Sequence, residues 1–114
     1  FDFFLADNTR IELIKIYGQI CMLDEPVTKE NYITLHHILK KQYKGATTID
    51  NGALLSRLMH QDLHFIEHWY YGEYGYVNEY LKYYKATRDE EEKGRMNKYV
   101  KQLTREIKID KARK

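Results

Sequence analysis

Residues 60–80 read HQDLHFIEHWYYGEYGYVNEY, with histidines at three positions four residues apart, followed by aromatic residues at about every second position. This stretch continues a run of apolar residues at helical spacing that begins near Asp50 or Asn51 and ends at Gly72. The apolar positions are Leu55, Leu58, Met59, Leu63, Ile66 and Tyr70. We therefore expect a helix from about residue 50 to residue 72, and the rest of the fold is built outward from it.

The segment after this helix reads GEYGYVNEYLKYYKAT (residues 72–87). Its alternating aromatic residues would suit a strand, but Val77, Tyr80 and Tyr84 also fall on one helical stripe. We predict a helix because the sequence offers no second strand-like segment to pair with it. Thr87 and Glu90 then have the spacing of a capping box, which starts a last helix with basic residues toward its end.

Two more helices are expected before residue 50. The first begins at the capping-box pair Thr9 and Glu12 and runs from about residue 9 to 23, where Pro26 and its acidic neighbours end it. The second ends near Gly45, before the loop sequence ATTIDNG (residues 46–52), and its apolar stripe consists of Tyr32, Leu35, Leu39 and Tyr43. The sequence therefore predicts an all-α fold, a single bundle of four to five helices over residues 1–114 with a basic amphipathic C-terminal helix.

The composition fits one helical domain. The chain has 114 residues, of which 43% are hydrophobic and 32% charged, and a single proline and six glycines leave long segments free for helix. Cys21 has no partner for an internal disulfide and lies in an apolar pattern, so we expect it in the core. The sequence has neither a signal-peptide pattern nor an apolar run that could span a bilayer, which predicts a cytoplasmic protein without a membrane partner. It begins at Phe1 rather than methionine, which leaves open that it is a piece of a longer protein.

The row formed by His60, His64 and His68 is the pattern closest to a metal site. Each step of four residues rotates by about 40°, so the rings spread over about 80° and one ion reaches two neighbours at most. A third ligand must then come from elsewhere in the chain. Arg57 falls within this stripe, and the apolar residues lie on the opposite side of the helix. We therefore expect the row to face solvent, with no metal and no cofactor, and keep the row as the alternative metal site.

Arg57 and His64 supply the enzymatic alternative. Their spacing, R-x6-H, is similar to that of HEPN-type helical ribonucleases, in which arginine and histidine serve the cleavage of RNA. The residue after the arginine is usually polar in those enzymes, whereas here it is Leu58. Glycine-rich phosphate loops, paired cysteines and zinc-protease motifs are absent from the sequence. The enzymatic alternatives are therefore a HEPN-like ribonuclease or a metal-dependent site on the histidine row.

Aromatic residues are concentrated between residues 69 and 84 of a chain that has eleven tyrosines. Tyrosine can bury its ring while its hydroxyl stays in water, so these residues can pack helices together, form a protein interface or stack on bases. The aromatic surface that we predict for a partner consists of Trp69, Tyr70, Tyr74, Tyr76 and Tyr80.

The C-terminal segment is strongly basic. Residues 93–114 contain nine Lys or Arg against two acids, whereas the rest of the chain is net acidic. One face of the predicted helix is basic and lies opposite an apolar face, so the helix can dock by one side and bind phosphates or an acidic partner by the other. The predicted contact residues are Lys98, Lys101, Arg105 and Lys108.

Asp62 lies on the apolar face of the helix expected from residue 50 onward, where an unpaired carboxylate is costly. His36 has the same problem on the apolar face of the preceding predicted helix. We therefore predict that Asp62 is largely buried and bonded to His36 or, alternatively, to a tyrosine hydroxyl.

Two stretches resemble, in order, the RteC family of regulators carried on conjugative transposons. They are FDFF with IELIKIYGQICMLDEP (residues 1–4 and 11–26) and LHFIEHWYYGEYGYVNEYL (residues 63–81). In that family an acidic residue follows a Tyr-Leu pair. This chain departs from the pattern, because it reads Tyr76-Val77-Asn78 at that place. The resemblance implies an all-helical regulatory domain, with DNA binding by a separate winged-helix region. We therefore expect a non-enzymatic regulatory or interaction domain of a mobile-element transcription regulator, with a protein partner and, through the basic helix, nucleic acid.

Overall fold

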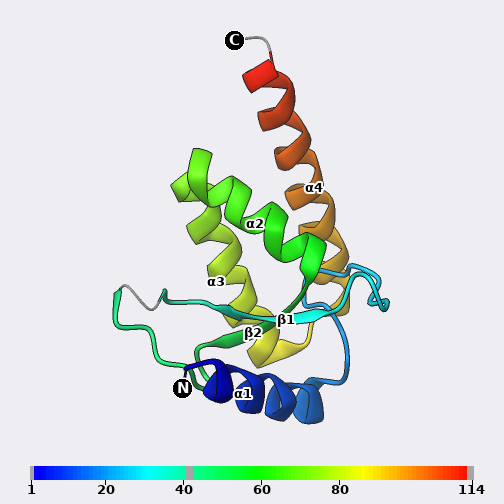
Figure 1. Cartoon of the computed structure of the whole chain (residues 1–114). Coiled ribbons are helices and arrows are strands. Elements are labelled where there is room, and N and C mark those ends of the chain that lie inside the picture. Colours follow the sequence, from blue (N-terminus) through cyan, green and yellow to red (C-terminus); the bar gives the residue numbers. More distant parts are fainter. Residues whose placement is uncertain (1, 41–42, 113–114) are drawn as a thin grey trace.

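The computed structural model describes residues 2–40 and 43–112, and its helices enclose a two-stranded sheet. The elements in chain order are α1 (Asp2–Tyr17), β1 (Ile33–His37), β2 (Gly52–Ser56), α2 (Arg57–Trp69), α3 (Tyr71–Thr87) and α4 (Glu90–Ala112). Helix α1 lies on one side of the sheet, and α2, α3 and α4 lie on the other, with α4 extending farthest from the sheet (Figure 1). The all-α prediction is therefore wrong, and the fold is α+β.

Strands β1 and β2 pair antiparallel, with Ile33 opposite Ser56 and His37 opposite Gly52. All five residues of β2 are buried, because α1 and α2 both pack on the sheet. A strand that is covered on both faces has a continuous apolar run instead of an alternation, and such a run resembles the start of a helix. For this reason the sequence pattern predicts helix over residues 50–56, where the structure has a loop and β2.

The helix predicted over residues 32–45 does not form, because residues 33–37 are β1. The β-branched residues Ile33 and Thr34 favour a strand. Successive side chains of a strand alternate between its faces, so Thr34 and His36 project to the same side. Thr34 contacts α2 and His36 contacts α3 through hydrogen bonds, which places this side of β1 under the helical layer.

Helix α1 begins before Thr9 and ends at Tyr17, so the predicted bounds of 9–23 are wrong at both ends. Gly18 has a positive φ of 88°, a conformation that glycine adopts readily where a helix stops. Beyond Gly18 the chain runs beside β2, where the Met22 backbone N–H donates to the Leu54 carbonyl at 2.9 Å. Cys21 is buried in this segment, as the sequence predicts.

The helices predicted for residues 72–87 and for the C-terminal segment are confirmed, but the junction between α3 and α4 differs in its cap. Thr87 donates its hydroxyl to the Tyr83 carbonyl and does not form the capping box with Glu90. Asp89 takes that role, because its Oδ1 accepts from the Glu92 backbone N–H at 3.2 Å.

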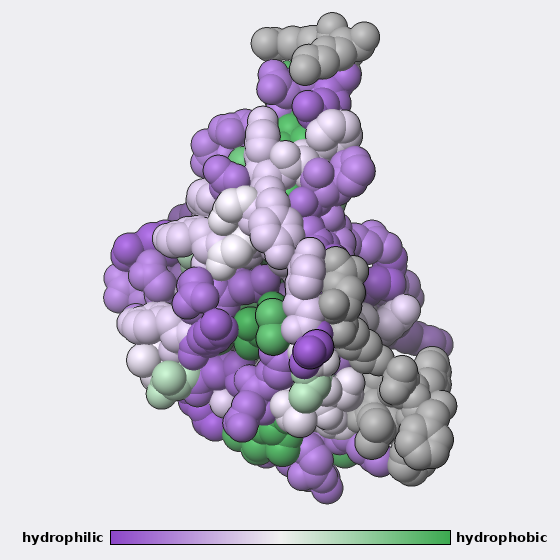
Figure 2. Space-filling view, turned by 90° about the vertical axis from the view of Figure 1, so that its left-hand side faces the viewer, coloured by the Kyte–Doolittle hydropathy of each residue, from purple (hydrophilic) through white to green (hydrophobic). Residues whose placement is uncertain are grey.

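The core lies between the sheet and the helices and includes the rings of Tyr74, Tyr80 and Tyr84. The Tyr80 side chain is 6% exposed, and its hydroxyl donates to the Met22 carbonyl at 3.0 Å. The face shown in Figure 2 is mainly hydrophilic, and its hydrophobic residues form small separate areas. Within the described ranges, no helix combines the length and the apolar character that a membrane crossing requires.

Candidate metal centre

Three histidines meet between β1 and α2. His36 comes from β1, and His60 and His64 come from successive turns of α2. One ring nitrogen of each residue lies within 4.8 Å of the other two. The ring centroids are 4.7 Å apart for His60 and His64, 5.3 Å for His36 and His60, and 5.7 Å for His36 and His64. Two histidines of the predicted row therefore lie beside a third histidine on β1. We call His36, His60 and His64 the three-histidine cluster.

His36 is almost fully buried, and its hydrogen bond fixes which ring nitrogen carries the proton. Its Nε2 lies 2.8 Å from Asn78 Oδ1 on α3. An amide oxygen only accepts, so Nε2–H is the donor and Nδ1 keeps a free lone pair. The Nδ1 atom is buried and has no hydrogen-bond partner among the residues that the structure describes. A buried acceptor without a donor is rare in folded proteins, and a metal ion would satisfy it.

His60 is fixed in the same way by Thr34. The Thr34 hydroxyl donates its only proton to the Leu55 carbonyl at 2.7 Å, and it also lies 2.7 Å from His60 Nδ1. Because that proton is already used, the hydroxyl oxygen must accept from His60 Nδ1–H. The Nε2 atom of His60 is then the unprotonated nitrogen.

The Glu67 carboxylate orients the ring of His64 through a hydrogen bond. Its Nδ1 lies 2.9 Å from Glu67 Oε1, one turn along α2. The other carboxylate oxygen, Oε2, accepts from the Lys40 ammonium at 2.5 Å. A carboxylate oxygen accepts, so Nδ1–H donates, and in the neutral tautomer of His64 the unprotonated nitrogen is Nε2. A carboxylate that holds the N–H of a histidine in this way is typical of metal-ligating histidines.

Burial keeps two of the three imidazoles neutral at physiological pH. It lowers the pKa of His36 to about 4, against the opposing effect of the hydrogen bond to Asn78. It also lowers the pKa of His60 to about 3, and the neighbouring His36 and His64 add to this effect. A histidine must be neutral to bind a metal ion, so no protons need to leave these two residues near pH 7.

The donor set fits a tetrahedral transition-metal ion. Nitrogen ligands lie about 2.0–2.1 Å from zinc, which puts two such nitrogens about 3.4 Å apart. The ligand atoms of the three-histidine cluster lie within 4.8 Å of one another, so the rings must move inward to reach that spacing. Neutral imidazoles suit Zn, Cu, Ni and Co, whereas Mg and Ca prefer oxygen ligands.

His68 does not belong to the cluster. Its side chain is exposed, and its ring packs edge-on against Trp69 with centroids 4.8 Å apart. This agrees with the helical geometry, in which one ion reaches only two neighbours of the row. The expectation that the whole row faces solvent is correct for His64 and His68, which are exposed, but not for His60, which is half-buried between α2 and β1.

Arg57 and His64, the pair with ribonuclease-like spacing, line one shallow hollow of about 460 Å³. Arg57 donates its Nε–H to the Glu30 carbonyl at 2.9 Å, and His64 is held by Glu67. The two side chains thus face the same space, but each is oriented by a different neighbour. The residues grouped with His64 are His36 and His60, and Arg57 is not among them.

The predicted pair of Asp62 and His36 does not form. His36 bonds to Asn78, and Asp62 faces α4, where one carboxylate oxygen lies 3.7 Å from Lys101 Nζ. The Asp62 side chain is 22% exposed rather than largely buried. The prediction failed because residue 36 lies on a strand, so the helical phase that placed it opposite Asp62 does not apply.

The predicted aromatic surface divides into two groups. Trp69, Tyr70 and Tyr76 are exposed, whereas Tyr74 and Tyr80 are core residues with 2% and 6% of their surface accessible. Tyr74 packs its ring 6.1 Å from that of His36, and its hydroxyl lies near the Asn78 amide without a hydrogen bond of normal geometry. The continuous aromatic surface is therefore a wrong prediction.

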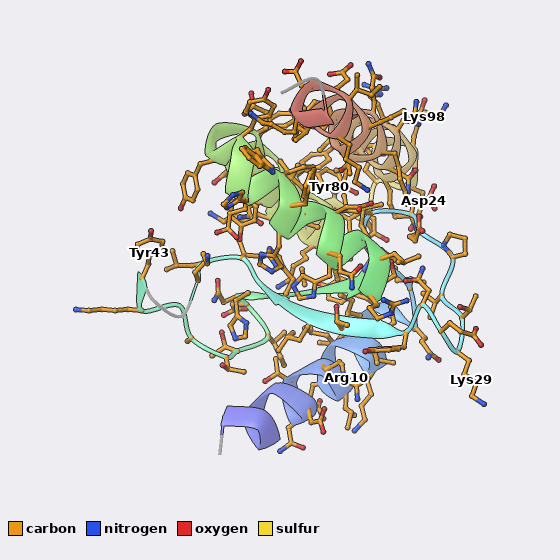
Figure 3. All side chains as sticks on the ribbon, turned by 45° about the horizontal axis from the view of Figure 1, so that its top comes forward. Arg10, Asp24, Lys29, Tyr43, Tyr80 and Lys98 are labelled. Carbon is orange, nitrogen blue, oxygen red and sulfur yellow. The ribbon has the colours of Figure 1, made fainter. Side chains whose placement is uncertain are left out.

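The predicted basic face of α4 is also divided. Lys98 and Arg105 are exposed, and Lys98 projects from the outer side of α4 (Figure 3). Lys101 pairs with Glu25 at 3.2 Å, and Lys108 lies over the Phe65 ring at 5.7 Å. Lys101 and Lys108 thus contact neighbours of α4, although Lys108 is also exposed, and Lys98 and Arg105 lie on the exposed surface of α4.

The sequence reasoning missed the residues that orient the histidines, which are Thr34, Glu67 and Asn78. It also paired His36 with the wrong residue. The available signal was the strand pattern of residues 33–37, because it puts Thr34 and His36 on one face. Comparisons with protein-family models, with curated proteins and with solved structures found no match to this chain.

Proposed function

We propose that this chain is a metal-binding domain that holds one divalent transition-metal ion, with zinc as the first candidate, through His36, His60 and His64. The observation that carries the proposal is the set of three hydrogen bonds that put the ring protons on Nε2 of His36 and on Nδ1 of His60 and His64. The remaining nitrogen of each ring is a free donor atom for the ion.

Such an ion ties three elements together. It bonds β1 to α2 directly, and it reaches α3 through the His36–Asn78 hydrogen bond. Binding to the folded chain alone adds a free energy of RT ln(1 + [Zn]/Kd) to stability, which is about 2.7 kcal/mol at a hundredfold excess over Kd. The ion would therefore stabilise the packing of the hairpin against the helical layer.

The broader expectation of a regulatory or interaction domain is a second proposal. It is supported by Lys98 and Arg105, which are exposed on α4, and by the exposed rings of Trp69 and Tyr76. The resemblance to the RteC family and the nucleic-acid contact stay predictions.

The metal proposal is tested by zinc titration of protein that was purified without nickel resin and freed of metal by a chelator. We expect one equivalent of zinc to bind. His64→Ala is the informative variant, because the His64 side chain is 46% exposed and its removal spares the core. The loss of one of three ligands should weaken binding by on the order of a hundredfold or more.

His68→Ala is the matched control, since it removes an exposed histidine from the same helix at the next four-residue step. It should bind zinc like the unmodified chain. Equal weakening by His64→Ala and His68→Ala, or no binding by the unmodified chain, would refute the proposal. Far-ultraviolet circular dichroism of each variant verifies that it is folded.

A further inference from the structure

The three-histidine cluster leaves a tetrahedral ion one ligand short. In the described part of the chain, no fourth histidine, cysteine or carboxylate joins the group. Glu67 is the nearby carboxylate, but its two oxygens are engaged by His64 and Lys40. Structural zinc sites are closed by four protein ligands, whereas sites with three protein ligands keep a position for water or an external ligand.

A hollow of about 220 Å³ adjoins the three histidines and can hold the fourth ligand. His36, His60 and His64 all line this hollow, and the other residues around it are Leu35, His37 and Lys40. A water molecule takes about 30 Å³ of liquid volume, so the hollow has room for an ion of several heavy atoms. The ligand that completes the coordination is therefore small.

The charges around the hollow favour an anion. Three neutral imidazoles leave the ion's two positive charges uncompensated, and the Glu67 charge is balanced by Lys40 at 2.5 Å. The Lys40 ammonium has three N–H donors, and its hydrogen bond to Glu67 uses one of them. An oxyanion can bond to the metal through one oxygen and accept from Lys40 with another.

We infer that the site is an open one, in which the metal ion binds a small oxyanion of the carboxylate or phosphate kind and Lys40 holds a second oxygen of that anion. This inference rests on the proposed metal site and names the ligand that it takes. It makes Lys40, from the segment after β1, a binding residue that neither the histidine spacing nor the basic helix indicates.

Cobalt provides the test, because its visible absorption reports its coordination. Protein loaded with one equivalent of Co²⁺ is titrated with acetate and, separately, with inorganic phosphate. We expect the absorption bands to shift with a saturable dependence on the anion. Lys40 also bonds to Glu67, so the Kd of cobalt is measured separately for each variant. Lys40→Gln should raise the Kd of the anion for the cobalt-loaded protein about tenfold, and Lys40→Arg should restore anion binding because the charge is kept.

Lys29→Gln is the matched control, since Lys29 is an exposed lysine in the loop before β1 (Figure 3) and does not line the hollow. Cobalt binding without any anion-dependent shift would overturn the open site while leaving the metal site intact. Equal anion affinity in Lys40→Gln and Lys29→Gln would overturn the role of Lys40. The absence of cobalt binding would refute the metal site itself and this inference with it. A shift with acetate alone or with phosphate alone would support the inference and identify the class of anion.

Discussion

His36 links the core to the three-histidine cluster. Its ring is buried beside those of His60 and His64, its Nε2 donates to Asn78, and its Nδ1 has no hydrogen-bond partner among the described residues. The Asn78 side chain is itself buried on α3, so it cannot move away without breaking packing. The position of one amide oxygen therefore decides which nitrogen of His36 is available to an ion.

Substitution of Asn78 tests this dependence. Asn78→Ala leaves the buried His36 Nε2–H without an acceptor, which should lower the free energy of unfolding of the metal-free chain by about 1–3 kcal/mol. It also frees the imidazole to change its tautomer, so zinc binding should weaken by about 10–100-fold. Urea denaturation and zinc titration measure the two effects.

Asn8→Ala is the comparison for Asn78→Ala, because Asn8 is an exposed asparagine on α1. It should alter neither the free energy of unfolding nor zinc affinity beyond error. Unchanged zinc affinity in Asn78→Ala would show that the orientation of His36 does not depend on this hydrogen bond.

At the scale of elements, α2 and α4 meet through a shared cation. Lys101 of α4 lies 3.2 Å from Glu25 and 3.7 Å from Asp62 of α2. Burial raises the pKa of the Asp62 carboxyl, although Lys101 and Lys108 oppose the rise. Ionisation of Asp62 is therefore unfavourable in the fold, chiefly because the carboxyl is partly buried.

The raised pKa of Asp62 has a consequence for stability against pH. The folded chain holds the Asp62 proton more tightly than the unfolded chain, in which the pKa is about 3.9. This carboxyl therefore makes the free energy of unfolding fall as pH rises from the unfolded pKa through the folded pKa, after which its effect is constant. Asp62→Asn cannot lose a proton, so its stability relative to the unmodified chain should increase over that range.

We expect Asp62→Asn to match the unmodified chain near pH 3 and to exceed it at pH 7 by on the order of 1 kcal/mol or less, since the pair is partly solvated. Urea denaturation at a series of pH values gives this difference. Asp110→Asn, which removes an exposed aspartate from α4, is measured beside it as the comparison. A loss of stability in Asp62→Asn at pH 7 would mean that the ion pair with Lys101 outweighs the cost of burial.

The sequence predicts the helices that bury one face and expose the other, and it misses the two strands. Residues 72–87 and the C-terminal segment have a stripe against the core and a polar face, and both are helices as predicted. Strand β2 is covered on both faces, so its apolar run carries no period. Strand β1 has only five residues, and its partner lies beyond a long loop.

The i, i+4 relation of His60 and His64 is a local property and is visible in the sequence. The third histidine depends on the pairing of β1 and β2 and could not be found from spacing.

At the scale of the whole molecule, the sheet separates two layers, and only one of them contributes to the three-histidine cluster. The three-histidine cluster and the residues that orient it come from β1, α2 and α3. Helix α1 packs on the other face of the sheet and contributes no residue to the cluster (Figure 1). Local opening of α1 therefore leaves the cluster intact, whereas opening of β1 or α2 destroys it.

Hydrogen exchange with and without zinc distinguishes the two layers. A ligand slows the exchange of amides whose opening breaks its site, and it leaves other local openings unchanged. Zinc should therefore slow exchange in β1, in α2 and around Asn78, and have little effect on the exposed side of α1 from Asp7 to Ile11. Uniform slowing over the entire chain would indicate that the amides exchange only through global unfolding.

The origin of the three histidines also bears on the order in which the chain assembles. His60 and His64 are separated by one helical turn, so they can share an ion as soon as α2 begins to form, and the ion then offsets part of the entropic cost of helix nucleation. His36 can join only after the chain between β1 and α2 has closed into the hairpin, a slower event that requires ordering a long loop. A metal ion would thus act first on a local element and later on a distant contact, so that the nascent α2 turn becomes the docking point to which β1 is recruited.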